Sequence, residues 1–163
     1  MKIWETIKRF KLRQLFVLSK TLLLNPIYIL PTYSATKETL KICDEKFGEA
    51  HHQNNKSNAF RHALWNFLIA ERCFRGNNSV EKSLFWAKKI TDLHEELSPN
   101  KSLAKFMDLH NNEIGRKLFQ QKINKEKIIP VLEKYMKSAL EISIEKEAQS
   151  NPSKLIYIEN DER

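Results

Sequence analysis

The stretch SNAFRHALWNFLIAERCFR, residues 57–75, decides the fold of this chain. When its residues are placed about 100° apart around a helix, one face is fully apolar and consists of Phe60, Ala63, Leu64, Phe67 and Ala70. The opposite face mixes polar and apolar side chains: Asn58, His62, Trp65, Asn66 and Ile69. A helix that is apolar nearly all round is typically buried, so we predict that this helix lies at the centre of the domain. Its polar side chains would then line an internal site.

Further helices are expected on both sides of this segment, because apolar residues recur at helical spacing along most of the chain. Asn25-Pro26 and Gly48 are predicted to end the first two helices, since the residue before proline disfavours helical geometry and glycine commonly follows a helix. Ser79 is a suitable N-cap for the fourth helix, and Pro130 falls in the first turn of the last. The predicted helices cover residues 3–24, 34–47, 57–75, 79–97, 102–121 and 128–148.

The predicted fold is all-α, a single compact domain of five to six helices with a buried polar site between the three central ones. Residues 26–32 are interpreted as a connector and residues 51–56 as a loop. The C-terminal residues are polar around Leu155-Ile156-Tyr157-Ile158, a piece that could dock in an extended conformation. The chain is therefore predicted to consist of a basic amphipathic N-terminal helix (residues 1–24), a helical domain (residues 34–149) and a polar C-terminal tail (residues 150–163).

Composition narrows the class of protein. The chain has 163 residues, 41% of them hydrophobic, which is enough for one domain with a real core. Its three glycines argue against a phosphate-binding glycine loop, so no nucleotide cofactor is expected. Cys43 and Cys73 are isolated in the sequence, which makes a disulfide framework or a thiolate metal site improbable and favours a reducing compartment.

The net charge of +8 is concentrated at the N-terminus, where residues 1–20 carry six Lys or Arg against one Glu. Aromatic and aliphatic residues alternate with these charges, beginning at Ile3 and Trp4. Two interpretations stay open: a surface helix whose apolar stripe packs on the domain, or a helix that binds an anionic membrane surface. Nucleic acid is not expected as a partner, because the rest of the chain lacks a basic face. The sequence makes no prediction of oligomeric state.

The run from Leu15 to Leu30 is too interrupted to cross a bilayer, because Lys20, Asn25 and Pro26 fall within it. A secretory signal is not predicted either, since Ser34-Ala35 is only a faint cleavage site. The expected location is therefore the cytoplasm, with the inner membrane surface as the alternative.

The fourth and fifth predicted helices also carry polar residues in their apolar stripes. His94 falls in the middle of the stripe of residues 79–97, with Glu95 on its flank. Asn111 lies within the stripe of residues 102–121, while Arg116 is predicted to face away. Asp108 and Gly115 share one edge of that helix and His110 lies on the other. Because glycine allows close approach, a neighbouring helix or a ligand is expected to pass near Gly115.

Burying such groups costs a few kcal/mol each unless they are paired, so their convergence from three helices indicates a site. The candidate catalytic residues are His62, His94, Glu95, Asp108 and Asn111. The candidate substrate-binding residues are Asn58, Arg61, Trp65, Asn66, Asn112 and Arg116. The candidate ligands of a divalent metal are His62, His94, Asp108 and His110, since imidazole and carboxylate suit zinc, iron, nickel or manganese.

Three functions are compatible with these residues. The leading hypothesis is metal-assisted hydrolysis of a phosphoester or ester, in which the metal activates a bound water. A metal-free alternative uses His62 or His94 as general base, oriented by a neighbouring carboxylate, with Asn side chains on the oxyanion. A third interpretation assigns the polar cluster to architecture alone, with function in a basic first helix that binds a membrane or a protein partner.

The ordered motifs Asn58-Ala-Phe-Arg61-His62-Ala-Leu-Trp65-Asn66, Asp92-x-His94-Glu95 and Met107-Asp108-x-x-Asn111-Asn112-x-x-Gly115-Arg116 resemble an uncharacterised bacterial all-α domain family. That family occurs as stand-alone proteins and as modules of larger, toxin-like proteins. The resemblance covers about residues 50–120. It supports the site residues and implies no particular reaction.

A weaker similarity connects the chain with the HD-type metal-dependent phosphohydrolases, which are helical and use a His, then a His-Asp pair, then further ligands. Arg61-His62, His94-Glu95 and His110 followed by Gly115 are similar to that layout. Glu95 stands where the family has Asp, and the distal Asp has no clear counterpart. The similarity therefore implies a metal but leaves the ligand geometry open.

Overall fold

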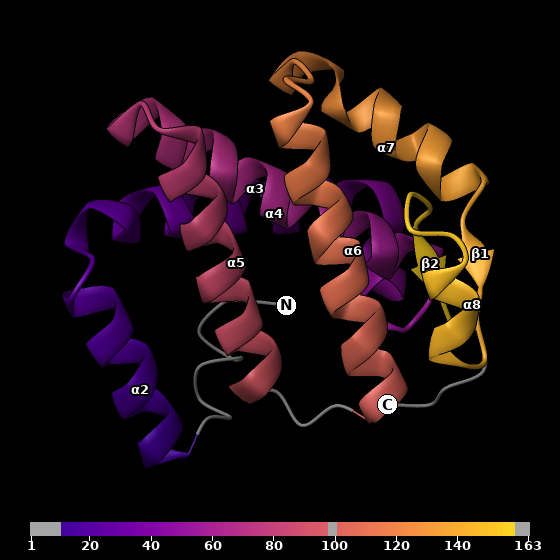
Figure 1. The fold of residues 1–163 in the computed structure, drawn as a ribbon, viewed down its shortest axis with the longest axis horizontal. Helices are drawn as coiled ribbons and strands as arrows, with labels where there is room; N and C mark the ends of the chain where they lie inside the picture. Colours follow the sequence, from indigo (N-terminus) through magenta and orange to yellow (C-terminus); the bar gives the residue numbers. More distant parts are fainter. Residues whose placement is uncertain (1–10, 98–100, 159–163) are drawn as a thin grey trace.

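The computed structural model describes residues 11–97 and 101–158 and has an all-α architecture, as the sequence predicts (Figure 1). Within these residues, seven α-helices occur with three short 3-10 helices and one pair of very short strands. The α-helices are α2 (Leu12–Leu23), α3 (Ile29–Phe47), α4 (Lys56–Asn77), α5 (Val80–Leu97), α6 (Ser102–Gln120), α7 (Ile128–Lys137) and α8 (Glu145–Gln149). The 3-10 helices are Pro26–Tyr28, Gly48–His52 and Lys125–Lys127, and the strands are β1 (Leu140–Glu141) and β2 (Ile156–Tyr157).

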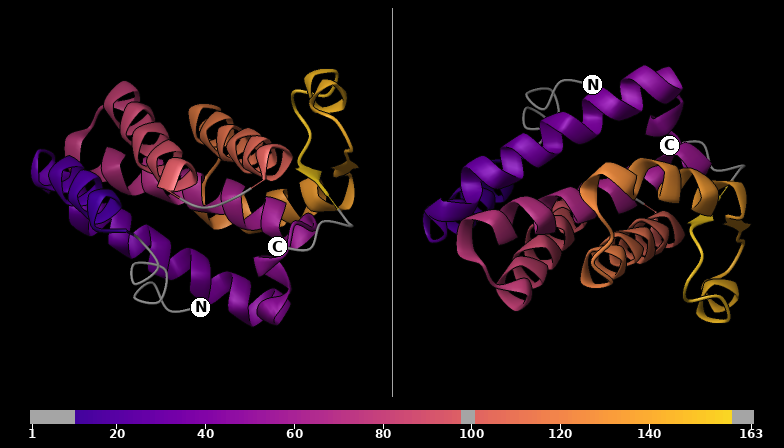
Figure 2. Two further views of the ribbon diagram at one scale, coloured as in Figure 1. Left: turned by 90° about the horizontal axis from the view of Figure 1, so that it is seen from below. Right: turned by 90° about the horizontal axis from the view of Figure 1, so that it is seen from above.

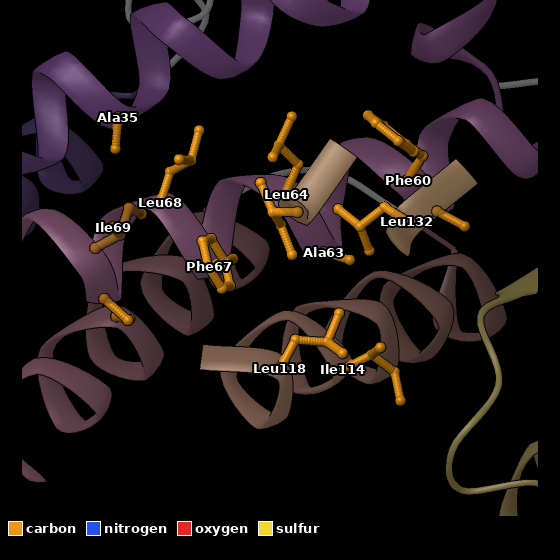
Figure 3. Packing of buried hydrophobic residues seen from close by; sticks show 14 of the residues in the cluster. Ala35, Phe60, Ala63, Leu64, Phe67, Leu68, Ile69, Ile114, Leu118 and Leu132 are labelled. Atoms are coloured by element: carbon orange, nitrogen blue, oxygen red, sulfur yellow. The ribbon is translucent and has the colours of Figure 1, made fainter. Parts of the chain in front are cut away.

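Helix α4 lies at the centre of the domain, which confirms the prediction from its apolar surface. Helix α3 packs on one side of it and helices α5 and α6 on the other (Figure 2). Helix α7 also contacts α4, through Leu132 among others. Figure 3 shows Ile114 and Leu118 of α6 pointing toward α4, where they meet its buried apolar residues. Those residues are Ala59, Phe60, Ala63, Leu64, Phe67, Leu68, Ile69, Ala70 and Cys73.

The ends of α4 are fixed by asparagines. The side-chain oxygen of Asn55 accepts hydrogen bonds from the backbone amides of Ser57, at 3.0 Å, and Asn58, at 3.2 Å. Asn55 is therefore the N-cap, and the helix begins at Lys56, one residue before the predicted start at residue 57. The helix ends at Asn77, two residues after the predicted end at residue 75, and Asn78 follows with a left-handed φ of 52°.

The segment interpreted as a connector, residues 26–32, is largely helical, so that expectation was wrong. A 3-10 helix covers Pro26–Tyr28, and α3 begins at Ile29 with Pro31 inside its first turn. Proline is tolerated there because the first backbone amides of a helix have no intrahelical acceptor. The predicted helix of residues 3–24 agrees with α2 over Leu12–Leu23, and residues 1–10 lie outside the described residues.

Within residues 11–97 and 101–158, each helix taken singly is too short or too polar to span a membrane. Only the bent pair Leu12–Leu23 and Pro26–His52 meets that criterion of length and composition, and its two parts are inclined by 98°.

The predicted last helix, residues 128–148, is interrupted, and this is the largest error in the predicted secondary structure. Helix α7 ends at Lys137, after which β1 pairs in parallel with β2. The Leu140 amide donates to the Leu155 carbonyl and the Ile142 amide to the Tyr157 carbonyl, each at 2.9 Å, in place of helical hydrogen bonds. Docking of an extended piece near the C-terminus is confirmed, because Leu155 and Ile156 are fully buried.

Candidate functional site

Three titratable side chains from three different helices meet beside α4. His62 of α4, Glu95 of α5 and Asp108 of α6 are all buried, with 3%, 1% and 1% of their surface exposed. His62 Nε2 lies 3.2 Å from Asp108 Oδ1, and His62 Nδ1 lies 3.6 Å from Glu95 Oε1. One nitrogen and two carboxylate oxygens of this set lie within 4.8 Å of one another. The structure thus brings together three of the predicted site residues, and Glu95 lies within the group although it was expected on the flank of its helix.

The close approach of α4 and α6 makes this arrangement possible. The two helices run in the same direction, so that His62 faces Asp108 and Asn112, while Asn66, one turn later, faces Asn112. Gly115 lies directly against the backbone of Ala63, and a Cβ atom at Gly115 would lie only 2.0 Å from the Ala63 carbonyl oxygen. The predicted close contact at Gly115 is thus with a neighbouring helix.

A network of side-chain amides holds the three helices in register. Arg116 NH1 donates to Asn66 Oδ1 at 2.8 Å, and the Thr91 hydroxyl donates to the same oxygen at 3.1 Å. Asn66 Nδ2 donates in turn to Asn112 Oδ1 at 2.6 Å. Arg116 was expected to face away from the stripe, and that expectation was wrong, because its guanidinium reaches across to α4.

The network also determines the tautomer of His62. Arginine can only donate, so the oxygen of Asn66 must face Arg116 and its amide nitrogen must face Asn112. The oxygen of Asn112 is then the atom 3.1 Å from His62 Nδ1, and it requires a proton on Nδ1. In the neutral ring, His62 Nε2 therefore carries a lone pair, which faces Asp108 Oδ1 and Arg61 NH2.

Arg61 connects the buried site with a second cluster of histidines. Its NH2 group lies 2.9 Å from His62 Nε2, while its NH1 group lies 3.2 Å from His52 Nδ1 and 3.5 Å from His51 Nδ1. His51 Nε2 is 2.7 Å from Asp44 Oδ1 on α3. Asp44 lies on another helix and has no motif around it, so the sequence did not identify it.

His94 and His110, both predicted as metal ligands, are not members of the buried set. His94 is half-buried, with its ring 5.2 Å from that of Trp65 in an edge-to-face contact. His110 Nε2 lies 2.9 Å from the Lys154 carbonyl oxygen near the C-terminal strand. Among the described residues, neither belongs to a group of three potential ligands. Burial lowers the pKa of His110 below its ordinary value, and the hydrogen bond to the Lys154 carbonyl opposes this shift.

Asn111 and Trp65, predicted to act in catalysis and substrate binding, have structural partners instead. Asn111 bonds the backbone of Ile156 twice, through its Nδ2 atom at 2.9 Å and its Oδ1 atom at 3.0 Å. It thereby fixes β2 against α6. Trp65 Nε1 donates to the Thr36 hydroxyl at 2.8 Å and fixes α4 against α3.

Two buried amides retain unused hydrogen-bonding capacity. Asn58 is fully buried one turn before His62, and neither of its side-chain polar atoms has a hydrogen-bond partner within residues 11–97 and 101–158. The Nδ2 atom of Asn112 likewise has none there. Buried polar atoms are nearly always paired, so unused capacity of this kind indicates a place for water or a ligand.

A groove of about 460 Å³ runs between α5 and α6 on the outside of the site. Arg116 lines this groove and also bonds Asn66, so one guanidinium contacts both the groove and the buried network. The other lining residues are Lys88, Asp92, Glu96, Lys105, Phe106, Leu109, His110 and Glu113.

The chain matches the model of a family described as "Domain of unknown function (DUF6973)" over residues 19–140, which is more than half of its length. The chain belongs to this family. No curated protein and no solved structure matched the chain. The DUF6973 region includes α3 to α6 and therefore every residue of the buried site, while β2 lies beyond it. The prediction of an uncharacterised domain family is confirmed.

Acidification is expected to destabilise this DUF6973 protein through His52. Burial, then the proximity of His51 and Arg61, lowers the pKa of His52 from 6.5 to about 4. The folded state favours the neutral ring, so protonation of His52 favours unfolding. The stability contributed by the neutral ring is fully present above pH 6.5 and is lost as the pH falls from there toward 4. Thermal unfolding at about pH 7.5 and about pH 5 should show a smaller loss for His52→Asn than for the wild type. If both proteins lost the same thermal stability on acidification, His52 would not be the source of the pH dependence.

Proposed function

We propose that this domain is a metal-dependent hydrolase acting on a phosphoester or ester, with His62, Glu95 and Asp108 holding one divalent cation. The observation that carries the proposal is the convergence of these three side chains, all buried, within 4.8 Å. They come from three different helices, so their proximity results from the packing of the helices and not from closeness in the sequence. The proposed ligands belong to the ordered motifs of the sequence: His62 ends Asn-Ala-Phe-Arg-His, Glu95 ends Asp-x-His-Glu, and Asp108 is the Asp of Met-Asp-x-x-Asn-Asn.

The donor set suits a transition-metal ion such as zinc, manganese, iron or nickel. One imidazole nitrogen and two carboxylate oxygens form a common ligand combination for these ions. Two atoms that ligate the same ion at about 2.1 Å are themselves separated by roughly 3.0–3.4 Å, and His62 Nε2 and Asp108 Oδ1 are 3.2 Å apart. A dication would also neutralise two carboxylates that are almost completely removed from water.

The surroundings of His62 support the same role. Asn112 fixes the proton on Nδ1, which is how hydrogen-bonded neighbours orient metal-binding histidines. The lone pair of Nε2 faces the Arg61 guanidinium, so a cation already occupies this direction. In the metal-bound protein Arg61 would turn toward His51 and His52, to which its NH1 group is already close.

Three protein ligands leave coordination positions open for water and substrate. A bound metal would lower the pKa of that water and polarise a phosphoryl or acyl oxygen. The guanidinium of Arg116 at the α5–α6 groove is suited to bind an anionic group of the substrate. A metal-activated water next to a polarised phosphoryl or acyl oxygen is the reason why a phosphoester or a carboxylic ester is the proposed substrate class.

Elemental analysis of the protein, purified without a histidine tag after growth with zinc, manganese, iron and nickel, tests the proposal. We expect about one metal ion per chain in the wild type and almost none in Asp108→Asn or Glu95→Gln. The matched control is Asp44→Asn combined with His52→Asn, which removes two members of the second cluster of potential ligands and should keep the ion. A wild type without metal, or variants that retain it, would refute the metal site.

Hydrolysis is then measured on simple phosphomonoesters, phosphodiesters and carboxylic esters with the metal-loaded protein. Activity that is removed by chelation and by Asp108→Asn supports the proposed reaction. A stoichiometric metal without any such hydrolysis would leave a metal-binding protein and refute the hydrolase assignment.

A further inference from the structure

A second feature, independent of the buried site, lies where α2 meets α3. Large apolar side chains are exposed there in unusual number, and we refer to this surface as the α2–α3 corner. Its exposed residues are Leu12 (87%), Phe16 (68%), Leu23 (74%), Leu24 (71%), Ile27 (67%), Leu30 (77%) and Tyr33 (54%). Large exposed apolar side chains gathered in one part of a domain indicate an interaction site.

Helix α2 contributes little to the core, and its outer side is exposed among residues 11–97 and 101–158. None of its residues is fully buried; Leu18 and Leu22 pack partly against the domain, and Gln14 Nε2 donates to the Leu97 carbonyl at 2.9 Å. These contacts fix one side of α2. The views in Figures 1 and 2 place α2 at the edge of the molecule, away from α7 and the strands.

The exposed side of α2 combines an apolar stripe with flanking positive charge. On a helix of about 100° per residue, Leu12, Phe16 and Leu23 fall within about 40° of one another. Arg13 and Lys20, both exposed, lie beside that stripe. This combination of a narrow apolar stripe and adjacent basic residues is typical of helices that lie in the interface of a bilayer.

The sequence around the corner contains no acidic residue over a long distance. Between Glu5 and Glu38 there is no Asp or Glu, whereas Lys8, Arg9, Lys11, Arg13, Lys20 and Lys37 all occur there. A surface of this charge repels a second copy of itself and attracts an anionic surface.

We propose that the α2–α3 corner binds the surface of a membrane that contains anionic phospholipid. The apolar side chains enter the headgroup region while Arg13 and Lys20 contact lipid phosphates. The bend of 98° between α2 and the following helical segment places Leu23, Leu24, Ile27 and Leu30 at the apex, where a flat surface can reach them. This binding is independent of the proposed metal site and would keep the domain at a membrane whatever its reaction.

Vesicle co-sedimentation of the full chain tests this inference. The wild type is expected to bind vesicles of phosphatidylcholine with about one-third phosphatidylglycerol, and to bind far less to phosphatidylcholine alone. Phe16→Ser with Leu23→Ser, and separately Arg13→Gln with Lys20→Gln, should each weaken binding by about tenfold or more. Because these positions are exposed, far-UV circular dichroism and the Tm should change little.

The matched control replaces two equally exposed apolar residues elsewhere, Phe85→Ser with Ile144→Ser. This control should bind the anionic vesicles like the wild type. Absence of wild-type binding, binding that ignores the anionic lipid, or equal loss in the control would overturn the inference. So would a wild-type dimer, seen by light scattering, that Phe16→Ser with Leu23→Ser converts to monomer, because the corner would then be a protein interface.

Discussion

Replacing Gly115 with alanine is expected to destabilise the protein by about 3 kcal/mol or more. The added Cβ would lie 2.0 Å from the carbonyl oxygen and 2.8 Å from the carbonyl carbon of Ala63. Because these are backbone atoms, no side-chain rotation can relieve the clash, and α4 and α6 must separate. Thermal or denaturant unfolding measures the effect, with a Tm lower by roughly 6–12 °C for a domain of this size.

The matched control is Gly76→Ala near the C-terminal end of α4. An added Cβ at Gly76 would meet nothing within 4 Å, and alanine favours a helix over glycine by about 1 kcal/mol. Gly76→Ala should therefore be neutral or stabilising. If the two variants unfolded at the same temperature, the contact between Gly115 and Ala63 could not determine the spacing of the helices.

The position of α4 was predictable because its sequence leaves no polar face for water. Helix boundaries were predictable where local chemistry sets them, as at Gly48, which follows α3 with a φ of +56°. The break after Lys137 was not predictable in this way. It depends on backbone pairing of Leu140 with Leu155, fifteen positions apart, and the local pattern still reads as helical there.

The site differs from the predicted one mainly on α5, where the buried side of the helix is wider than its apolar stripe. A stripe drawn through the apolar residues of α5 includes His94 and leaves Glu95 outside. In the structure the buried side keeps Ala87 and Ile90 of that stripe and extends beyond one edge of it to Thr91 and Glu95. Polar residues face inward here because α4 and α6 present polar partners, and hydrophobicity along a single helix carries no information about those partners.

The same limit explains the missed connections of Arg61 and Arg116. Both are basic residues whose local pattern allows an exposed position, yet both contact buried groups of other elements. Arg61 reaches His62 and the two histidines of the preceding segment, and Arg116 reaches Asn66. A long side chain can cross from the edge of a helix to its buried side, so its rotational position alone does not determine its contacts.

The substitution Asp108→Asn is expected to make the protein more stable than the wild type without metal and less stable than the wild type with metal. In chelator-treated protein, Glu95 and Asp108 are two buried carboxylates with oxygens within 4.8 Å of each other and of a ring nitrogen of His62. Neutralising one of them removes a like-charge repulsion and a desolvated charge, so the free energy of unfolding should rise by about 1–2 kcal/mol. Isosteric Asn keeps the packing, which makes charge the main difference between the two proteins.

With saturating metal the order should invert, because only the wild type gains binding free energy in the folded state. At a metal concentration of about 100 times Kd this gain is about 2.7 kcal/mol, and the Asn variant should gain almost none. Denaturant unfolding of both proteins, with chelator and with metal, measures all four values. A cluster that served architecture alone predicts a different result: Asp108→Asn would be the less stable protein in both conditions, since it would break a buried ionic network. The crossing of the two stabilities therefore distinguishes a site built to bind a cation from one built to hold three helices together.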